Sequence, residues 1–308
     1  MPNDERRYRL RWVDVFTDRA LAGNPLAVVL GADGLSTGQM QAIARETNLS
    51  ETTFVLPAET RERAAKVRIF TPHVELPFAG HPTVGTGWVL LDEGLVSSDA
   101  AAFTLEEGVG PIAVRVDRGG PAIVLWMSHP PAKFGEVIEQ RADVAAALGL
   151  TGGDLLPDVP IQIASTGLPF VYVALKDAAA VDRAVPGAEA LTFVLDPHGL
   201  PPVFLFAATG GSRLYSRMFG SHSATSIVED PATGSASGPL GAFAVRHGLI
   251  PRAVEVSIVS EQGTKMGRQS FIQIKLAYSI DGDVPERIEV GGSVVPVMTA
   301  EISIREAN

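Results

Sequence analysis

The sequence has no cysteine and a deficit of positive charge, and both absences limit what the protein can do. Without cysteine, its 308 residues can form no disulfide, no thiolate metal site and no cysteine nucleophile. The absence is also compatible with a reducing cytoplasm. Lys and Arg total 25 against 35 Asp and Glu, a formal net charge of −10, which would repel a phosphate backbone. The sequence therefore predicts no nucleic-acid partner.

Long hydrophobic runs are also absent. No apolar stretch reaches the roughly 20 residues needed to cross a bilayer, and the polar residues 1–11 contain no apolar segment of a secretion signal. We therefore expect a cytoplasmic protein without a membrane partner. A chain of 308 residues, 46% of them hydrophobic, is long enough for two domains of about 150 residues each.

The two halves of the sequence resemble each other. Residues 75–83 (ELPFAGHPT) align without a gap with residues 229–237 (EDPATGSAS), 154 positions later, and both segments run on to a Gly-Leu pair. Two further pairs follow in the same order: Asn24-Pro25 with Leu168-Pro169, and Arg68-Ile-Phe70 with Arg217-Met-Phe219. The shared order predicts an internal duplication. The alternative is chance similarity between two glycine-rich helix starts.

Each half is expected to contain one buried helix. Residues 82–93 and 236–246 are small or apolar on nearly every side, which is typical of a helix surrounded by other elements. Another helix is expected at 36–47, where Ser36 and Gln39 can form a capping box. In the first half, strands are expected at 9–16, 27–30, 52–56, 66–70, 112–116 and 122–127.

These patterns predict an α+β fold of two pseudo-symmetric domains, each a curved, mostly antiparallel sheet wrapped around its central helix. The break at Ser128–Phe134 separates a first domain, residues 1–128, from a second, residues 129–286. The strand pattern at 287–308 is expected to return to the first sheet.

The starts of the two buried helices are candidate ligand sites. Gly80-His81 and Gly234-Ser235 would present unpaired N–H groups and a partial positive charge, which favour an anion such as a carboxylate. If the two halves face each other, both starts point into one cleft. Ser235 is expected to be the N-cap. In the alternative interpretation, the glycines only form tight turns and His81 is structural.

Two acidic residues are candidates for proton transfer. Glu51 lies where polar residues give way to the apolar strand 52–56, and a carboxylate in apolar surroundings can exchange protons near neutral pH. Asp230 lies just before the second helix start and can bind a substrate hydroxyl or amine. The alternatives are a solvated strand-end glutamate for Glu51 and a turn or cap role for Asp230.

Three segments together resemble the PhzF-like family of phenazine biosynthesis: 48–54 (NLSETTF), 70–83 (FTPHVELPFAGHPT) and 229–240 (EDPATGSASGPL). The resemblance implies a diaminopimelate-epimerase-like fold with the active site between two domains, usually in a homodimer. It implies that Glu51 is the acid/base, and that His81, Asp230 and Ser235 contact the substrate, with Gly80 and Gly234 beside them.

The expected activity is a cofactor-independent isomerase that moves a proton on a small cyclic or amino-acid-like carboxylate. The family example is the isomerisation of trans-2,3-dihydro-3-hydroxyanthranilate. The paired cysteines of epimerases with a similar fold have no counterpart here. An epimerase that uses carboxylates and a non-catalytic binding homologue remain alternatives. The six histidines form no metal-ligand spacing, and no nucleotide-binding motif is present, so neither metal nor cofactor is expected.

Overall fold

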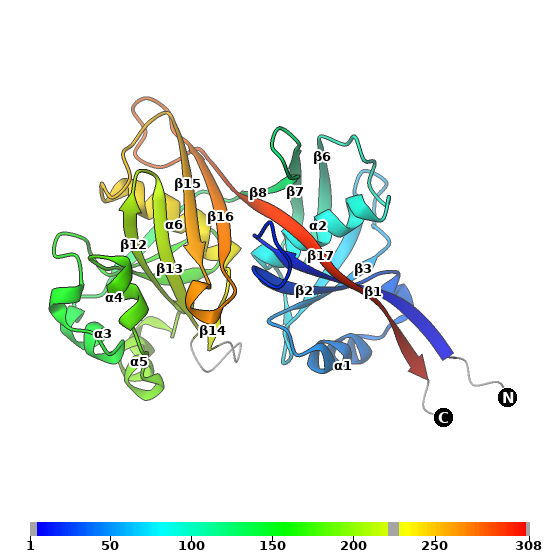
Figure 1. Ribbon diagram of the computed structural model, residues 1–308, viewed down its shortest axis with the longest axis horizontal. Helices are drawn as coiled ribbons and strands as arrows, with labels where there is room; N and C mark the ends of the chain where they lie inside the picture. Colours follow the sequence, from blue (N-terminus) through cyan, green and yellow to red (C-terminus); the bar gives the residue numbers. More distant parts are fainter. Residues whose placement is uncertain (1–4, 221–227, 306–308) are drawn as a thin grey trace. The chain divides into compact units, whose positions relative to one another are not determined.

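The structure is a computed structural model that describes residues 5–220 and 228–305. The chain divides into two compact units (Figure 1). Unit 1 comprises residues 1–127 and 292–308, and unit 2 comprises residues 128–291. Both contain strands and helices, so the predicted α+β class is confirmed. Among the described residues, no helix is long and apolar enough to cross a membrane.

Unit 1 contains two α-helices, α1 (Thr37–Thr47) and α2 (Gly80–Asp92), and one 3₁₀ helix, η1 (Ala32–Gly34). Its strands hydrogen-bond in the order β17–β1–β2–β3–β4–β6–β7–β8, and the short β5 lies beside β4. The strands are β1 (Glu5–Val15), β2 (Asn24–Val29), β3 (Thr52–Leu56), β4 (Ala65–Phe70), β5 (Glu75–Leu76), β6 (Ala102–Glu107), β7 (Gly110–Asp117), β8 (Val124–His129) and β17 (Arg287–Arg305). The last residues of β8 and the first residues of β17 belong to unit 2.

The strands of unit 2 hydrogen-bond in the order β9–β10–β11–β12–β13–β15–β16–β17, and the short β14 lies beside β13. These strands are β9 (Lys133–Val137), β10 (Gln162–Ser165), β11 (Pro169–Ala174), β12 (Val203–Gly210), β13 (Arg213–Phe219), β14 (Glu229–Asp230), β15 (Glu255–Gln262) and β16 (Ser270–Ala277). The helices are α3 (Arg141–Ala147), α4 (Ala178–Arg183), α5 (Ala188–Leu195), α6 (Gly234–Arg246), η2 (Gly152–Asp154), η3 (Asp196–His198) and η4 (Thr264–Met266).

The pattern of strand pairing in unit 1 occurs again in unit 2. In unit 1, β2 runs parallel to β3 and β4 parallel to β6, whereas β1–β2, β3–β4, β4–β5 and β6–β7 are antiparallel. In unit 2, β11 runs parallel to β12 and β13 parallel to β15, whereas β10–β11, β12–β13, β13–β14 and β15–β16 are antiparallel. Each unit therefore builds a two-residue strand directly before its buried helix.

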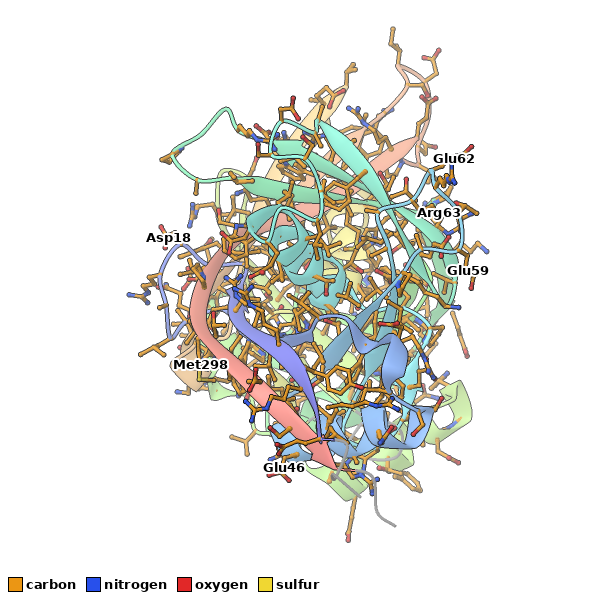
Figure 2. The ribbon with its side chains drawn as sticks, turned by 90° about the vertical axis from the view of Figure 1, so that its right-hand side faces the viewer. Asp18, Glu46, Glu59, Glu62, Arg63 and Met298 are labelled. Carbon is orange, nitrogen blue, oxygen red and sulfur yellow. The ribbon has the colours of Figure 1, made fainter. Side chains whose placement is uncertain are left out.

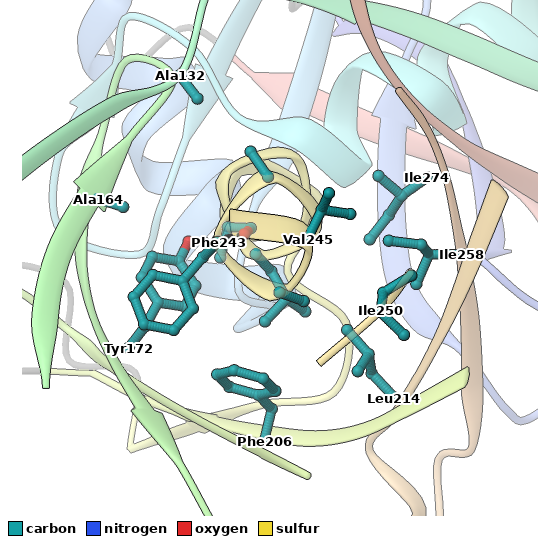
Figure 3. Packing of buried hydrophobic residues seen from close by; sticks show 14 of the residues in the cluster. Ala132, Ala164, Tyr172, Phe206, Leu214, Phe243, Val245, Ile250, Ile258 and Ile274 are labelled. Carbon is teal, nitrogen blue, oxygen red and sulfur yellow. Dashed lines mark hydrogen bonds between the residues drawn. The ribbon is translucent and has the colours of Figure 1, made fainter. Parts of the chain in front are cut away.

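The two helices α2 and α6 are buried along nearly their whole length. Figure 3 shows α6 nearly end-on, with Tyr172, Phe206, Leu214, Ile258 and Ile274 around it. The Tyr172 hydroxyl donates to the carbonyl oxygen of Ala236 in α6 at 2.7 Å. In unit 1 a Cβ at position 85 of α2 would lie 2.5 Å from Leu26 Cδ2, so a larger residue would push this side chain of β2 aside.

Helix α1 confirms the predicted capping box. The Gln39 amide N–H donates to Ser36 Oγ at 3.2 Å, and the Ser36 amide N–H donates to Gln39 Oε1 at 2.9 Å. Strand β6 is not foreseen from the sequence because two glutamates, Glu106 and Glu107, end it. Both are buried, so their burial depends on partners that local patterns do not show.

In each unit, one arginine–glutamate ion pair connects the two-residue strand to the strand beside it. In unit 1, Arg68 of β4 binds both carboxylate oxygens of Glu75 in β5 at 2.7 Å. In unit 2, Arg217 of β13 binds both oxygens of Glu229 at 2.8 and 2.9 Å, and it also donates to the carbonyls of Val181 and Ala184. Only the Arg217 side chain is nearly enclosed, at 8% exposure against 22% for Arg68.

We expect Arg217→Lys to destabilise the protein by about 2–3 kcal/mol, because lysine cannot reproduce a buried bidentate contact and the two carbonyl contacts at once. The matched Arg68→Lys should cost less than about 1 kcal/mol, because that pair is partly solvated. Urea denaturation of both variants measures the difference. Equal losses would show that the burial of Arg217 does not matter to stability.

Candidate active site

Glu51 is a buried carboxylate of unit 1. Helix α1 ends at Asn48, which adopts a left-handed conformation (φ 51°), and the chain then reaches β3 at Thr52. This turn leaves Glu51 only 8% exposed, so the alternative of a solvated strand-end glutamate is wrong. Its Oε2 lies 3.6 Å from Nδ1 of His81. The structure therefore brings together two residues that the sequence singled out separately.

His81 is the second residue of α2 and is 4% exposed. Burial lowers its pKa to about 3, against the opposing effect of a hydrogen bond to the Pro25 backbone, so the imidazole is neutral near pH 7. The side-chain amide of Asn24 lies with Nδ2 3.2 Å from His81 Nδ1. Which of the two groups donates in this contact depends on the tautomer of the ring.

In unit 2, Asp230 is the last residue of β14 and lies directly before the turn that leads into α6. It is 5% exposed, and its Oδ2 accepts a hydrogen bond from the Thr233 hydroxyl at 2.6 Å. Gln262, at the end of β15, accepts from the Thr233 amide at 3.1 Å and donates to the Asp230 carbonyl at 2.8 Å. The turn role expected as the alternative for Asp230 is thus real, and it fixes where the carboxylate lies.

The prediction that Ser235 is the N-cap of α6 is wrong. The helix begins at Gly234, its N-cap is Thr233, and Ser235 is its second residue and half-buried. The shift arises because Gln262 holds Thr233 in place, which allows the helix to start earlier. Gly80 and Gly234 are the first residues of α2 and α6, and both are buried. Amides in such first turns have no partner within the helix.

Three further residues shape these sites and were not foreseen from the sequence. Asn24 contacts His81, whereas Thr233 and Gln262 form the network around Asp230. Asn24 does carry a signal, because it is a polar residue at the start of an apolar strand. Gln262 carries none that is local, since its partners lie about thirty residues earlier in the chain.

Comparison with known proteins shows which class of enzyme this chain resembles. The chain is 36% identical over 284 residues to the trans-2,3-dihydro-3-hydroxyanthranilate isomerase of Pseudomonas aeruginosa, with 91% of this chain and 94% of that protein covered. It is 36% identical over 294 residues to the uncharacterized isomerase YddE of Salmonella typhimurium, with 95% and 97% covered. The protein is an isomerase.

The model of the family described as phenazine biosynthesis-like protein matches residues 13–300, and the chain belongs to this family. Among solved structures, the PhzF-family protein of Bacillus anthracis superposes with a TM-score of 0.87 at 27% identity, covering 97% of this chain and all of that one. A protein described as a predicted epimerase from Pseudomonas aeruginosa has a TM-score of 0.81 at 33% identity, with 96% and 99% covered. The recognition made from the three motifs is confirmed.

Proposed function

We propose that the protein catalyses a cofactor-independent proton shift on a small cyclic or amino-acid-like carboxylate, with Glu51 as the group that takes and returns the proton. The observation that carries this proposal is the contact between the buried Glu51 carboxylate and the neutral His81 imidazole, at the start of α2. A carboxylate held in an enclosed, weakly polar position is suited to general acid–base catalysis.

The remaining site residues are proposed to bind the substrate. The amides at Gly80–His81 and at Gly234–Ser235 belong to helix first turns, which favour the negative charge of a substrate carboxylate. The carboxylate of Asp230 and the ring proton of His81 supply one acceptor and one donor for polar substituents. We propose that each set binds a polar or negatively charged group of a substrate. The expected homodimer stays a prediction.

The finer fold assignment belongs to the same proposal: two domains of the diaminopimelate-epimerase type. A hydroxyproline epimerase from Agrobacterium vitis supports it at the level of the fold alone, with a TM-score of 0.65 at 11% identity. The two-cysteine mechanism of such epimerases needs residues that this sequence does not contain. A single glutamate that removes a proton and returns it at another atom suits an isomerisation.

A carboxylate-based epimerase is the second candidate. The 33% identity to a predicted epimerase favours it, and so does a second buried carboxylate, Asp230. An epimerase would need both an acid and a base, and a carboxylate can serve as either. Its product would differ from the substrate in one stereocentre, whereas the isomerase product would have a displaced double bond.

Incubation in heavy water with a panel of unsaturated cyclic amino acids tests the proposal. We expect a new isomer with a displaced double bond and deuterium at the carbon that accepts the proton, detected by NMR and mass spectrometry. Inversion of one centre without a displaced double bond would favour the epimerase. A compound that raises the melting temperature but shows neither change would contradict proton transfer on that class.

A further inference from the structure

Both units fix the loop before their buried helix with a residue at the end of a strand. In unit 1, Glu107 ends β6 and Gly108 follows. In unit 2, Gln262 ends β15 and Gly263 follows. A Cβ at Gly108 would lie 2.7 Å from Pro77 Cα, and a Cβ at Gly263 would lie 2.5 Å from the Pro231 carbonyl oxygen. Pro77 and Pro231 are themselves 154 positions apart, the offset of the sequence repeat.

The hydroxyl in the first turn of each helix makes the same contact. The Thr83 hydroxyl of α2 donates to the carbonyl of the N-cap residue Ala79 at 2.8 Å. The Ser237 hydroxyl of α6 donates to the carbonyl of the N-cap residue Thr233 at 2.9 Å. In unit 2, Gln262 completes the arrangement with its amide, which both donates and accepts. In unit 1, Glu107 is the residue at the corresponding strand end, and its partner is the Thr83 hydroxyl.

The number of hydrogens available to the Thr83 hydroxyl decides whether Glu107 is protonated. Thr83 Oγ1 lies 2.6 Å from Glu107 Oε1 and 2.8 Å from the Ala79 carbonyl oxygen. A hydroxyl has one hydrogen, and neither a carbonyl nor an ionised carboxylate can supply a second. Glu107 is 8% exposed, and its Oε2 has no hydrogen-bond partner among the described residues. An ionised carboxylate there would leave a buried charge unsolvated and one short oxygen–oxygen contact without a hydrogen.

We propose that Glu107 is held in its protonated form as the counterpart of Gln262, and that it positions the start of α2 by donating to Thr83, whose hydroxyl donates to Ala79. The protonated carboxyl resembles a glutamine amide in shape, and like the amide it has both a donor and an acceptor atom, with one O–H in place of two N–H bonds. Glu107 is thus a positioning residue, because it acts on Gly80 and His81 through Thr83. The role rests on the proposed function of those amides.

Among the described residues, Glu107 forms no ion pair with a charged side chain of the neighbouring elements. Glu106 of the same strand binds Arg63, and Figure 2 shows Arg63 with Glu59 and Glu62 in one region at the edge of unit 1. The other charged groups have partners elsewhere: Lys66 of β4 with Glu59, Glu75 of β5 with Arg68, Arg115 of β7 with Asp117, and His81 of α2 with Asn24 and Glu51. Burial accordingly raises the pKa of Glu107 to about 8.

The first test is the pH dependence of unfolding in wild type and Glu107→Gln. Between about pH 4.5, where the unfolded chain releases this proton, and about pH 8, the folded state keeps it. Stability therefore falls as pH rises, and the unfolding constant of the wild type should increase about tenfold per pH unit relative to the glutamine variant. Parallel curves between pH 5 and pH 8 would overturn the protonated state. The test needs no substrate, so its outcome is independent of the proposed function.

The second test concerns positioning and uses Glu107→Leu beside Glu107→Gln. Amide hydrogen exchange at Gly80 and His81 should accelerate at least about tenfold in the leucine variant and return to the wild-type rate in the glutamine variant. With a carboxylate substrate that the wild type converts, Glu107→Leu should raise KM more than it lowers kcat. Glu107→Gln should have the KM of the wild type. Exchange that is unchanged in the leucine variant would overturn the positioning role. Altered exchange with unchanged KM would instead count against the ligand role of these amides.

Discussion

Glu51→Gln should lower turnover by at least about two orders of magnitude while leaving the melting temperature close to that of the wild type. General acid–base catalysis contributes roughly 10²–10⁴-fold, and an amide of the same shape cannot accept and return a proton. The buried contact with His81 can be kept, because the amide has the same shape and can either donate to Nδ1 or accept from it. The measurement is product formation and deuterium uptake in heavy water with a compound that the wild type converts.

The matched control is Glu46→Gln, an exposed glutamate of α1 that Figure 2 labels at the surface. It removes the same charge from the same unit and should leave turnover within about twofold of the wild type. A Glu51→Gln enzyme with turnover near that of Glu46→Gln would remove Glu51 from the mechanism. A Glu51→Gln enzyme with a strongly lowered melting temperature would show that the carboxylate is needed for folding.

Gly263→Ala should be one of the most destabilising single-methyl changes in the protein. Gly263 has a positive φ of 75°, and an added Cβ would lie 2.4 Å from the Arg268 carbonyl oxygen and 2.5 Å from that of Pro231. Both are backbone atoms, which cannot rotate away, so the turn that holds Asp230 must move. We expect a loss of at least about 3 kcal/mol in the free energy of unfolding, together with reduced turnover.

Gly267→Ala separates the clash from the backbone strain. Gly267 has a similar φ of 71°, but nothing lies within 4 Å of an added Cβ. The variant should therefore lose only the roughly 1–2 kcal/mol of a left-handed alanine and keep its turnover. Chemical denaturation of both variants measures the difference. Equal destabilisation would mean that the turn around Pro231 yields easily, which would weaken the case that it fixes Asp230.

The parts of this fold that could be predicted are those with signals inside one element. The capping box of α1 and the apolar character of α2 and α6 lie within a few residues of the elements that they define. The relation of Glu51 to His81 could be suggested only through the family motifs. Glu51 lies just before β3 and His81 lies in α2, and the fold of unit 1 brings them within 3.6 Å of each other. Their separation in the sequence does not predict this contact.

The parts that could not be predicted depend on partners far along the chain. The start of α6 was misplaced because Gln262 fixes Thr233 from a strand almost thirty residues later. Strand β6 was not foreseen because its last residues are acidic, yet Glu106 is paired with Arg63 and Glu107 with Thr83. From the sequence alone, acidic residues are expected at the surface, because only their partners in the fold allow them to be buried.

Strand β17 has a consequence for how the protein is made. Residues 294–305 of this strand pair with β1, which begins at residue 5, so the two halves of that ladder are synthesised almost 300 residues apart. At about 5–20 residues per second, a ribosome needs roughly 15–60 s between them. Until then, one edge of β1 offers unpaired backbone groups to any neighbouring chain. Nascent chains should therefore require a chaperone, or transient shielding by the ribosome, throughout this interval.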